Sequence, residues 1–371
     1  MQVLDAIIGV ILVLIVLWDG FETVILPRRV TRRVRLARFF FRATWRIWTL
    51  AADRICSRKR HEAMLSYFGP LSLILLLAIW AAGLISGFAL IYFSAGLHPG
   101  FEQSLFFSGS VFFPLGGTGN IPNGMAGKSL AILEAALGFG FLAILISYFP
   151  PLNESFARRE VRISLMDARA GSPATAAEML RRHYGQYGME ELKQLFADWE
   201  IWSAELLESH LSYPALAFFR SQHDNQSWLA AMTAILDTSA LVIVGLEGAC
   251  VRQAQLTFAV ARHAIVDLSY IFRAAPMKSG HDRLPPADLA MLRSLLASSG
   301  LRLQEGEEAD RKLAELRAMY EPYVRSLSKY LHMSLPPWLP ESHRSDNWQT
   351  SGWEPGSGKP RLPGEVVERH F

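Results

Sequence analysis

Residues 101–113 read Phe-Glu-Gln-Ser-Leu-Phe-Phe-Ser-Gly-Ser-Val-Phe-Phe, and residues 114–120 continue as Pro-Leu-Gly-Gly-Thr-Gly-Asn. The first part is apolar but too short to cross a bilayer, which takes about 20 helical residues. The second part is a glycine cluster. Irregular backbone is tolerated at membrane depth only where protein buries it or where it lines a water-filled cavity. We therefore expect a re-entrant loop here, with a glycine-rich extracellular turn between two packed helices as the alternative.

Segments on both sides of this stretch are apolar enough to be transmembrane helices. The first runs from Val3 to about Leu26, within a segment 1–27 that we interpret as an uncleaved span rather than a signal peptide. The second is Pro70–Phe93, and the third runs from about Ser129 to Tyr148. We expect no further span from Asn153 onward.

Basic residues predict the orientation. Residues 28–64 hold twelve arginines and lysines but only two acids, Asp53 and Glu62. Segments of this kind stay on the cytosolic side of a membrane. The sequence thus predicts a multi-pass protein of the plasma (inner) membrane, with its N-terminus outside and its C-terminal part in the cytosol.

The same basic segment alternates arginines with aromatic residues, including Phe39, Trp45 and Trp48. This pattern is typical of an amphipathic helix at a membrane surface, facing anionic headgroups. Basic and aromatic residues also occur together in nucleic-acid-binding proteins. Because the segment lies between two spans, the lipid bilayer is the expected partner and nucleic acid is not.

The glycines at 116–119 suit a cation pathway. Successive carbonyl oxygens can replace the hydration shell of an ion only if they point to one side, which requires backbone angles that glycine adopts easily. A short helix before the cluster would direct its negative C-terminal end toward a cation.

Residues 65–150 resemble the two-span pore module of potassium channels. Ser104–Ser108 resembles the pore helix of that family, Gly117-Thr118-Gly119-Asn120 resembles its filter sequence Gly-Tyr-Gly-Asp, and Ala131–Gly138 is similar to the start of its inner helix. The resemblance implies a homotetramer that conducts a monovalent cation, with potassium as the expected ion. It also implies a filter formed by Leu115, Gly116, Gly117, Thr118, Gly119 and Asn120, and a hinge at Gly138.

This chain departs from the family filter in several positions. It has one extra glycine, so that either Gly116 or Gly117 matches the first filter glycine. Pro114 or Leu115 then replaces a threonine, Thr118 replaces a tyrosine, and Asn120 replaces an aspartate. These changes bear on ion selectivity, while the glycine carbonyls remain.

Three carboxylates lie in or near the spans, and charged groups there are functional candidates by default. Glu134 either flanks the pore or makes a structural hydrogen bond to the pore helix. Asp19 and Glu22 share a helical face. They either pair with the arginine-rich segment or act in gating.

Helical periodicity continues beyond the spans, and we expect an all-α cytosolic domain at 151–334 followed by a disordered tail at 335–371. Predicted helices begin at Ser172-Pro173, cover Met189–Leu206, begin near Asp224-Asn225 and run through 229–244, cover 246–272, begin at Pro285-Pro286, and cover 307–332. The expected fold class is thus an all-α membrane protein with three transmembrane helices, one re-entrant pore loop and an all-α cytosolic domain.

The sequence contains no dinucleotide-binding fingerprint and no nucleophile or metalloprotease motif, so we expect no enzyme and no cofactor. Cys56 and Cys250 are too far apart in sequence to suggest a disulfide framework. His183, His210, His263 and His332 lack ligand spacing, and no metal site is predicted. The function expected is an oligomeric cation channel. The alternative is a non-conducting membrane scaffold or sensor with a pore-like fold.

Overall fold

The computed structural model describes residues 2–25, 36–55, 58–113, 124–184, 188–221, 226–246 and 250–340. Within these ranges the secondary structure is helical, and the one β-type pairing is an isolated bridge between Leu246 and Leu303. The chain forms two compact units. The first contains Met1–Phe156 and His210–Arg220, and the second contains Ala157–Ser209 and Ser221–Phe371. His210–Arg220, expected in the cytosolic domain, therefore groups with the membrane helices.

The first unit is built on close packing of α1 (Gln2–Gly20) against α3 (Arg58–Ser94). A Cβ on Gly9 of α1 would lie 2.6 Å from the carbonyl oxygen of Gly87 in α3. A Cβ on Gly83, one turn away, would lie 2.8 Å from Val16 Cγ2. Small residues let helix backbones approach closely in lipid, where apolar burial alone does not drive helices together. At its end, α1 passes into a π-helical turn, η1 (Phe21–Ile25).

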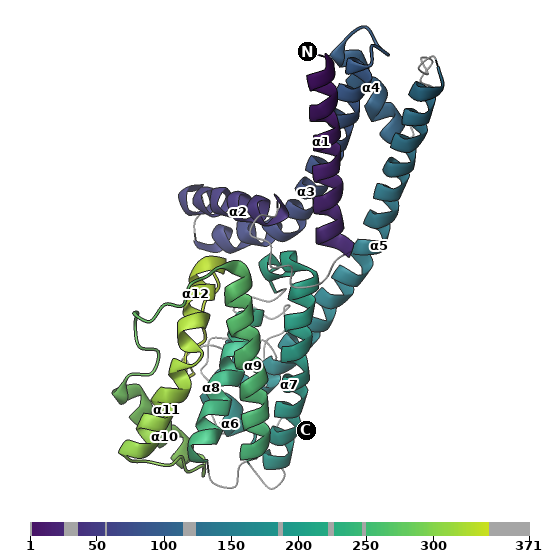
Figure 1. The fold of residues 1–371 in the computed structure, drawn as a ribbon. Coiled ribbons are helices and arrows are strands. Elements are labelled where there is room, and N and C mark those ends of the chain that lie inside the picture. The colour runs from purple at the N-terminus through teal and green to yellow at the C-terminus, as the bar shows by residue number, and fades with distance from the viewer. Residues whose placement is uncertain are drawn as a thin grey trace, which may run out of the picture. The chain divides into compact units, whose positions relative to one another are not determined.

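A second helix, α2 (Leu36–Ile55), lies across the direction of α1, beside the first turns of α3 (Figure 1). Trp48 Nε1 donates a hydrogen bond to the carbonyl oxygen of Met64, at 2.9 Å. The Trp45 ring contacts Phe68 at a centroid distance of 4.7 Å and Phe218 at 5.0 Å. Phe218 belongs to a 3-10 turn, η2 (Pro214–Phe218), so that aromatic packing attaches this distant segment to the first unit.

The short helix expected at 101–113 is present as α4 (Phe101–Phe112). After residues 114–123, which lie outside the described part, α5 (Met125–Ala170) begins. We expected the third span to end near Tyr148, but α5 continues through Pro150 and Pro151 to Ala170. A helix need not end where its hydrophobic part does, and the end of the span near Tyr148 stays a prediction.

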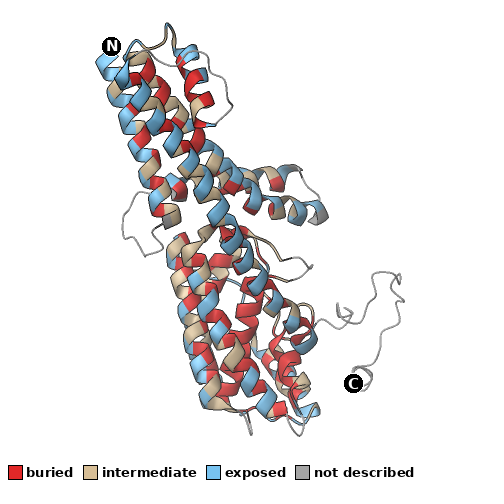
Figure 2. Cartoon of the chain, turned by 90° about the vertical axis from the view of Figure 1, so that its right-hand side faces the viewer, coloured by how far each residue is buried: buried red, intermediate tan, exposed pale blue. Residues whose placement is uncertain are grey.

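The described part of the second unit comprises the end of α5 and seven further helices. They are α6 (Ala176–Arg182), α7 (Gly188–Ser212, whose last turn belongs to the first unit), α8 (Trp228–Gly245), α9 (Val251–Phe272), α10 (Pro286–Ser298), α11 (Glu307–Ala318) and α12 (Glu321–Leu331). Every residue of α8 from Trp228 to Val244 is buried, and α7, α8 and α9 lie side by side (Figures 1 and 2).

Local chemistry explains where some of these helices differ from expectation. We expected a helix start at Ser172-Pro173, but those residues form a turn, and α6 begins at Ala176 because Thr175 Oγ1 accepts a hydrogen bond from the Glu178 amide at 3.2 Å. The continuous helix expected at 307–332 is divided after Ala318, since Pro322 has no amide hydrogen to continue the earlier helix. The helix expected at 246–272 begins at Val251 in the structure, as α9. The start expected near Asp224-Asn225 lies outside the described residues, and Ser227 caps α8.

Four helices in the described part of the chain are long and apolar enough to cross a membrane. They begin at Gln2, Arg60, Met125 and Trp228. The last of these corrects the statement that no further segment qualifies after Asn153. In Trp228–Gly245, 94% of the residues are buried among the helices of the second unit, whereas only 11% are buried in the apolar 18-residue part of Met125–Ala170. In Figure 2, buried residues are red and exposed residues are pale blue, and red residues are concentrated in the inner helices of the second unit.

The segment after α12 is packed onto the second unit as far as residue 340. Trp338 is only 2% exposed, and its ring lies 5.7 Å from the guanidinium of Arg283 and 5.5 Å from that of Arg317. The Ala177 amide also donates a hydrogen bond to the Trp338 carbonyl, at 3.3 Å. Residues 335–340, which the sequence analysis assigned to the tail, are therefore anchored by a buried tryptophan.

Candidate functional site

The short helix α4 doubles back along α3. Ser108, in its middle, places Oγ 2.8 Å from the carbonyl oxygen of Ile85. Ile85 lies nine residues before the end of α3, which corresponds to about 14 Å along a helix axis. The C-terminal half of α4 thus lies beside the interior of α3 rather than beyond its end.

Glu134 joins three helices of the first unit. Its side chain is fully buried, and Tyr92 of α3 donates a hydrogen bond from Oη to Glu134 Oε2 at 2.8 Å. Ser108 of α4 bonds to the other carboxylate oxygen, Oε1. Because Ser108 has a single hydroxyl hydrogen, it can donate to Glu134 or to Ile85, but not to both at once. When Ser108 donates to Glu134, this contact is the hydrogen bond to the 101–112 helix that was one of the two roles expected for Glu134.

Gly138, one turn after Glu134, lies against the last turn of α4. A Cβ at this position would come within 2.2 Å of the Phe112 carbonyl oxygen, far inside van der Waals contact. The structure thus gives this glycine a packing reason that is separate from the hinge role expected from the sequence.

Aromatic rings pack around the middle and the C-terminal end of α4. The Phe107 ring lies 5.0 Å from Tyr92 and 4.7 Å from His98, centroid to centroid. The Phe112 ring lies 5.6 Å from Phe141 of α5. Edge-on and tilted contacts at these distances add about 0.5–1.5 kcal/mol each to simple area burial. They support the same arrangement as the hydrogen bonds of Glu134.

The expected filter residues Leu115, Gly116, Gly117, Thr118, Gly119 and Asn120 lie outside the described residues. The structure describes the two ends from which that segment starts and returns. On one side α4 ends at Phe112, with the Phe113 amide bonded to the Gly109 carbonyl at 3.0 Å. On the other side Gly124 has a φ of +100°, which glycine adopts without strain.

Asp19, in the last turn of α1, is a second buried carboxylate of the first unit. It accepts hydrogen bonds from Trp80 Nε1 at 2.9 Å and from the Ala37 amide at 3.2 Å. The latter contact caps the first turn of α2 with a negative charge, which satisfies a free amide and suits the helix dipole. The expected alternatives for Asp19 were pairing with the arginine-rich segment and a role in gating. Residues 28–35 of that segment lie outside the described part, and among the described residues the hydrogen-bond donors to Asp19 are an indole and a backbone amide. Glu22, its expected companion, is also buried.

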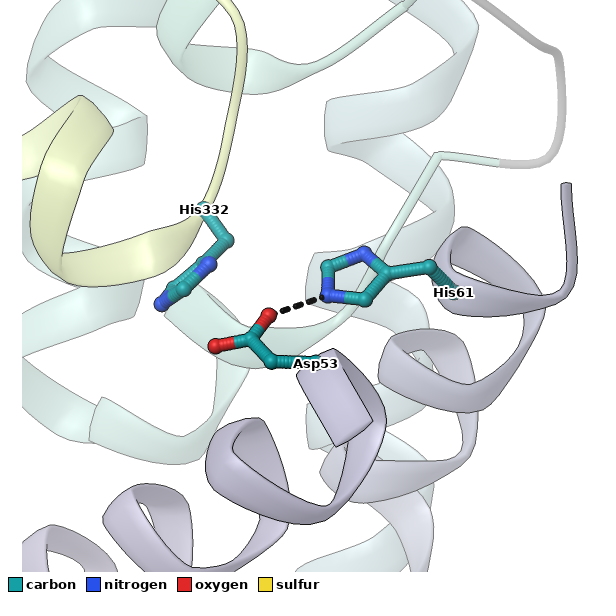
Figure 3. Close-up of side chains that lie close together, drawn as sticks. All are labelled: Asp53, His61 and His332. Atoms are coloured by element: carbon teal, nitrogen blue, oxygen red, sulfur yellow. Dashed lines mark hydrogen bonds and ion pairs between the residues drawn. The ribbon is translucent and has the colours of Figure 1, made fainter. Parts of the chain in front are cut away.

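Asp53 and His61 join the end of α2 to the start of α3 by a hydrogen bond of 2.9 Å (Figure 3). The pair is at the surface, with 52% of the Asp53 side chain exposed. The third residue labelled in Figure 3, His332, belongs to the second unit. Of the other histidines considered in the sequence, His183 is buried and its Nδ1 lies 2.7 Å from the Met179 carbonyl, as in an ordinary core histidine.

The second unit contains a buried ionic network that the sequence analysis missed. Asp237 of α8 pairs with Arg283 at 2.5 Å and accepts a hydrogen bond from Tyr320 Oη, also at 2.5 Å. Glu321 bonds to both Arg317 and Arg325, at 2.9 and 2.6 Å. Burial alone would lower the pKa of Arg283, but Asp237 outweighs it and raises that pKa above its ordinary value. The partners are up to 83 residues apart, so no local pattern indicated them.

Comparisons with known proteins agree with the membrane character and go no further. No family model matches the sequence, and no solved structure matches it. A curated relative named uncharacterized membrane protein YdjJ, from Bacillus subtilis (strain 168), is 28% identical over 196 residues. This alignment covers 49% of the chain and 55% of the relative, so the chain spans about half the length of the protein it matches. Together with the apolar helices, this likeness indicates an all-helical membrane protein.

Proposed function

We propose that the protein is a cation channel whose pore is formed by several copies of residues 65–150, most simply a homotetramer. In this proposal α1, α3 and α5 are the transmembrane helices, α4 is a re-entrant pore helix, and residues 115–120 form the filter. The N-terminus is outside, the second unit is cytosolic, and potassium is the expected ion. The buried helix α8 belongs to the cytosolic domain.

The position of α4 carries this proposal. The contacts of Ser108 with α3 and Glu134, and the close approach of α4 to Gly138, bring the C-terminal end of α4 against two long apolar helices. The negative end of the helix dipole is thereby directed toward the segment that continues as Pro-Leu-Gly-Gly-Thr-Gly-Asn. A cation at that level would be stabilised by the dipole and by glycine carbonyl oxygens.

Glu134 supports the proposal in a second way. A carboxylate inside a membrane is costly, and here hydroxyl groups from two different helices lie within hydrogen-bond distance of its two oxygens. Such an anchor fixes the depth and tilt of α4. This is what a carbonyl filter requires, because it must hold its oxygens in register around an ion.

The direct test is ion flux into proteoliposomes that contain the purified full-length protein. Potassium and sodium fluxes would be compared for the wild type, for Gly119→Ala and for Gly140→Ala. Gly140 is a matched control because a Cβ there meets nothing within 4 Å. We expect potassium flux to exceed sodium flux, to be lost in Gly119→Ala and to persist in Gly140→Ala.

Other results would change the proposal in defined ways. Equal fluxes of the two ions, lost in Gly119→Ala, would retain the channel and remove potassium selectivity, as the replacements at 114, 118 and 120 would explain. Absence of flux over a range of voltage and pH, from protein shown to be assembled by cross-linking, would contradict the channel. It would favour the alternative of a non-conducting scaffold or sensor.

A further inference from the structure

Helix α2 has two apolar faces, and only one of them is covered by the residues that the structure describes. The covered face is formed by Ala37, Phe41, Trp45, Trp48 and Ala52, which follow one another at intervals of three or four residues. Trp45 is 3% exposed, and Ala52 is fully buried. Side chains at this spacing lie on one side of a helix. This face attaches α2 to α3 and η2 through the aromatic contacts described above.

The opposite face repeats the same spacing with large side chains that are exposed among the described ranges of the chain. Leu36, Phe39, Ile47 and Leu50 are 46%, 72%, 69% and 58% exposed, and Ala43 continues the stripe between them. Four large apolar side chains in one exposed row are unusual for a surface in contact with water. The stripe belongs to a helix that is itself firmly held, since Asp19 caps its start and Trp48 bonds to α3.

Arginines border this stripe. Arg46 lies along its edge and Arg54 continues it by one further turn, and both are exposed. The one acid of the helix, Asp53, is bonded to His61. The flank of the apolar stripe is thus positive, which is complementary to phosphate groups and unfavourable for burial against a second copy of the same surface.

We propose that the outer face of α2 is a docking surface for the anionic phospholipids of one membrane leaflet, with Leu36, Phe39, Ile47 and Leu50 among the acyl chains and Arg46 and Arg54 on the headgroup phosphates. Helix α2 is not one of the four segments apolar enough to cross the membrane, whereas α1 is one of them. Helix α2 lies across the direction of α1 (Figure 1). An amphipathic helix with a basic border, held across a spanning helix, matches the interface between headgroups and acyl chains. The inference does not depend on ion conduction.

The depth of α2 can be measured with a nitroxide spin label on the full-length protein in nanodiscs. Ile47→Cys would be labelled in a background with Cys56→Ser and Cys250→Ser, and Ile201→Cys of α7, with Ile201 56% exposed, is the matched control. We expect the label at 47 to be relaxed by oxygen more than by a water-soluble nickel complex, and the label at 201 to show the reverse. Equal access to the nickel complex at both positions would overturn the proposal. So would dipolar broadening at position 47, because it would show that a second copy covers this face.

The choice of lipid is tested by charge removal. Binding of fluorescent phosphatidylglycerol would be compared with that of phosphatidylcholine for the wild type and for the Arg46→Gln/Arg54→Gln variant. Each basic residue near a membrane surface contributes about 1 kcal/mol, so we expect phosphatidylglycerol to bind roughly 25-fold more weakly to the variant and phosphatidylcholine to be unaffected. The control pair, Arg302→Gln/Arg311→Gln, removes the same charge from exposed sites in the second unit. An equal loss in both double variants, or no loss in either, would contradict a site on α2.

Discussion

Gly138 of α5 lies directly against the backbone of Phe112 at the end of α4, and a Cβ on Gly138 would come within 2.2 Å of the Phe112 carbonyl oxygen. This contact sets how closely the short helix approaches the long one. We predict that Gly138→Ala forces α4 away from α5 and destabilises the folded protein by about 1–3 kcal/mol, the usual cost of overpacking a close contact. Thermal unfolding in detergent measures the loss.

Gly140→Ala is the control for this change, because it makes the same substitution two residues along the same helix in open space. We expect it to unfold at the wild-type temperature or slightly above, since alanine favours a helix over glycine. Equal stability of the two variants would show that the 138–112 contact does not limit the approach of α4.

The hydrogen bond from Tyr92 to Glu134 gives a second prediction. Tyr92→Phe keeps the ring that packs on Phe107 but leaves one carboxylate oxygen of a fully buried Glu134 without its donor. A buried group left unsatisfied costs about 1–3 kcal/mol. Thermal unfolding should therefore shift to lower temperature in this variant. In Tyr67→Phe, where the ring is 62% exposed, it should not, and a shared shift would contradict the anchor role of Glu134.

Asp19 gives a prediction that can be read at a single amide. Asp19→Ala removes the acceptor of the Ala37 N–H at the start of α2 and of the Trp80 indole. Loss of a helix-capping side chain costs about 0.5–2 kcal/mol. Hydrogen exchange at Ala37 should become faster in this variant. It should stay unchanged in Asp5→Ala, which changes a carboxylate at the start of α1, the helix that carries Asp19 at its end. Unchanged exchange in both would mean that Asp19 does not hold α2.

The buried pair of Asp237 and Arg283 predicts a large effect in the second unit. Arg283→Met leaves a buried carboxylate with only Tyr320 as a partner, and breaking a buried pair in this way costs about 3–5 kcal/mol. Removing both charges in Asp237→Asn/Arg283→Met should restore part of the loss. Urea unfolding of the full chain measures both variants. Arg302→Met, at an exposed residue between α10 and α11, is the control, and an equal effect there would rule out the buried pair as the cause.

Glu178 predicts acid sensitivity. Burial by itself raises its pKa, but hydrogen bonds and charges from Arg181 and Arg182 outweigh this and hold the pKa below its ordinary value. A lowered folded-state pKa means that the stabilisation is complete above the unfolded-state pKa of about 4.3 and is lost as the pH falls through the lower, folded-state value.

We therefore expect Glu178→Gln to lower the unfolding temperature of the second unit at neutral pH and to reduce its dependence on acid pH. The exposed Glu315→Gln should alter neither. A wild-type pH dependence that Glu178→Gln leaves intact would assign the acid sensitivity to other carboxylates.

The sequence by itself determined the features that can be read within one helix. The apolar runs at 3–26, 70–93 and 129–148 identified three helices, and the apolar stretch ended by Pro114 identified the short helix at 101–112. Helical spacing likewise indicated α7, the apolar run 229–244 indicated α8, and Pro285-Pro286 indicated the start of α10. Each of these signals depends on residues within about twenty positions of one another, and hydrophobic spacing reports them directly.

Only the tertiary structure decided which groups meet. Glu134 finds Tyr92 across 42 residues, Asp19 finds Trp80 across 61, and Asp237 finds Tyr320 across 83. The same holds for α2, whose two apolar faces are indistinguishable in sequence until packing covers one of them. Local spacing fixes the faces of a helix, but the free energy of burial depends on which surfaces the folded chain brings together, and that is set by the packing of all the helices at once.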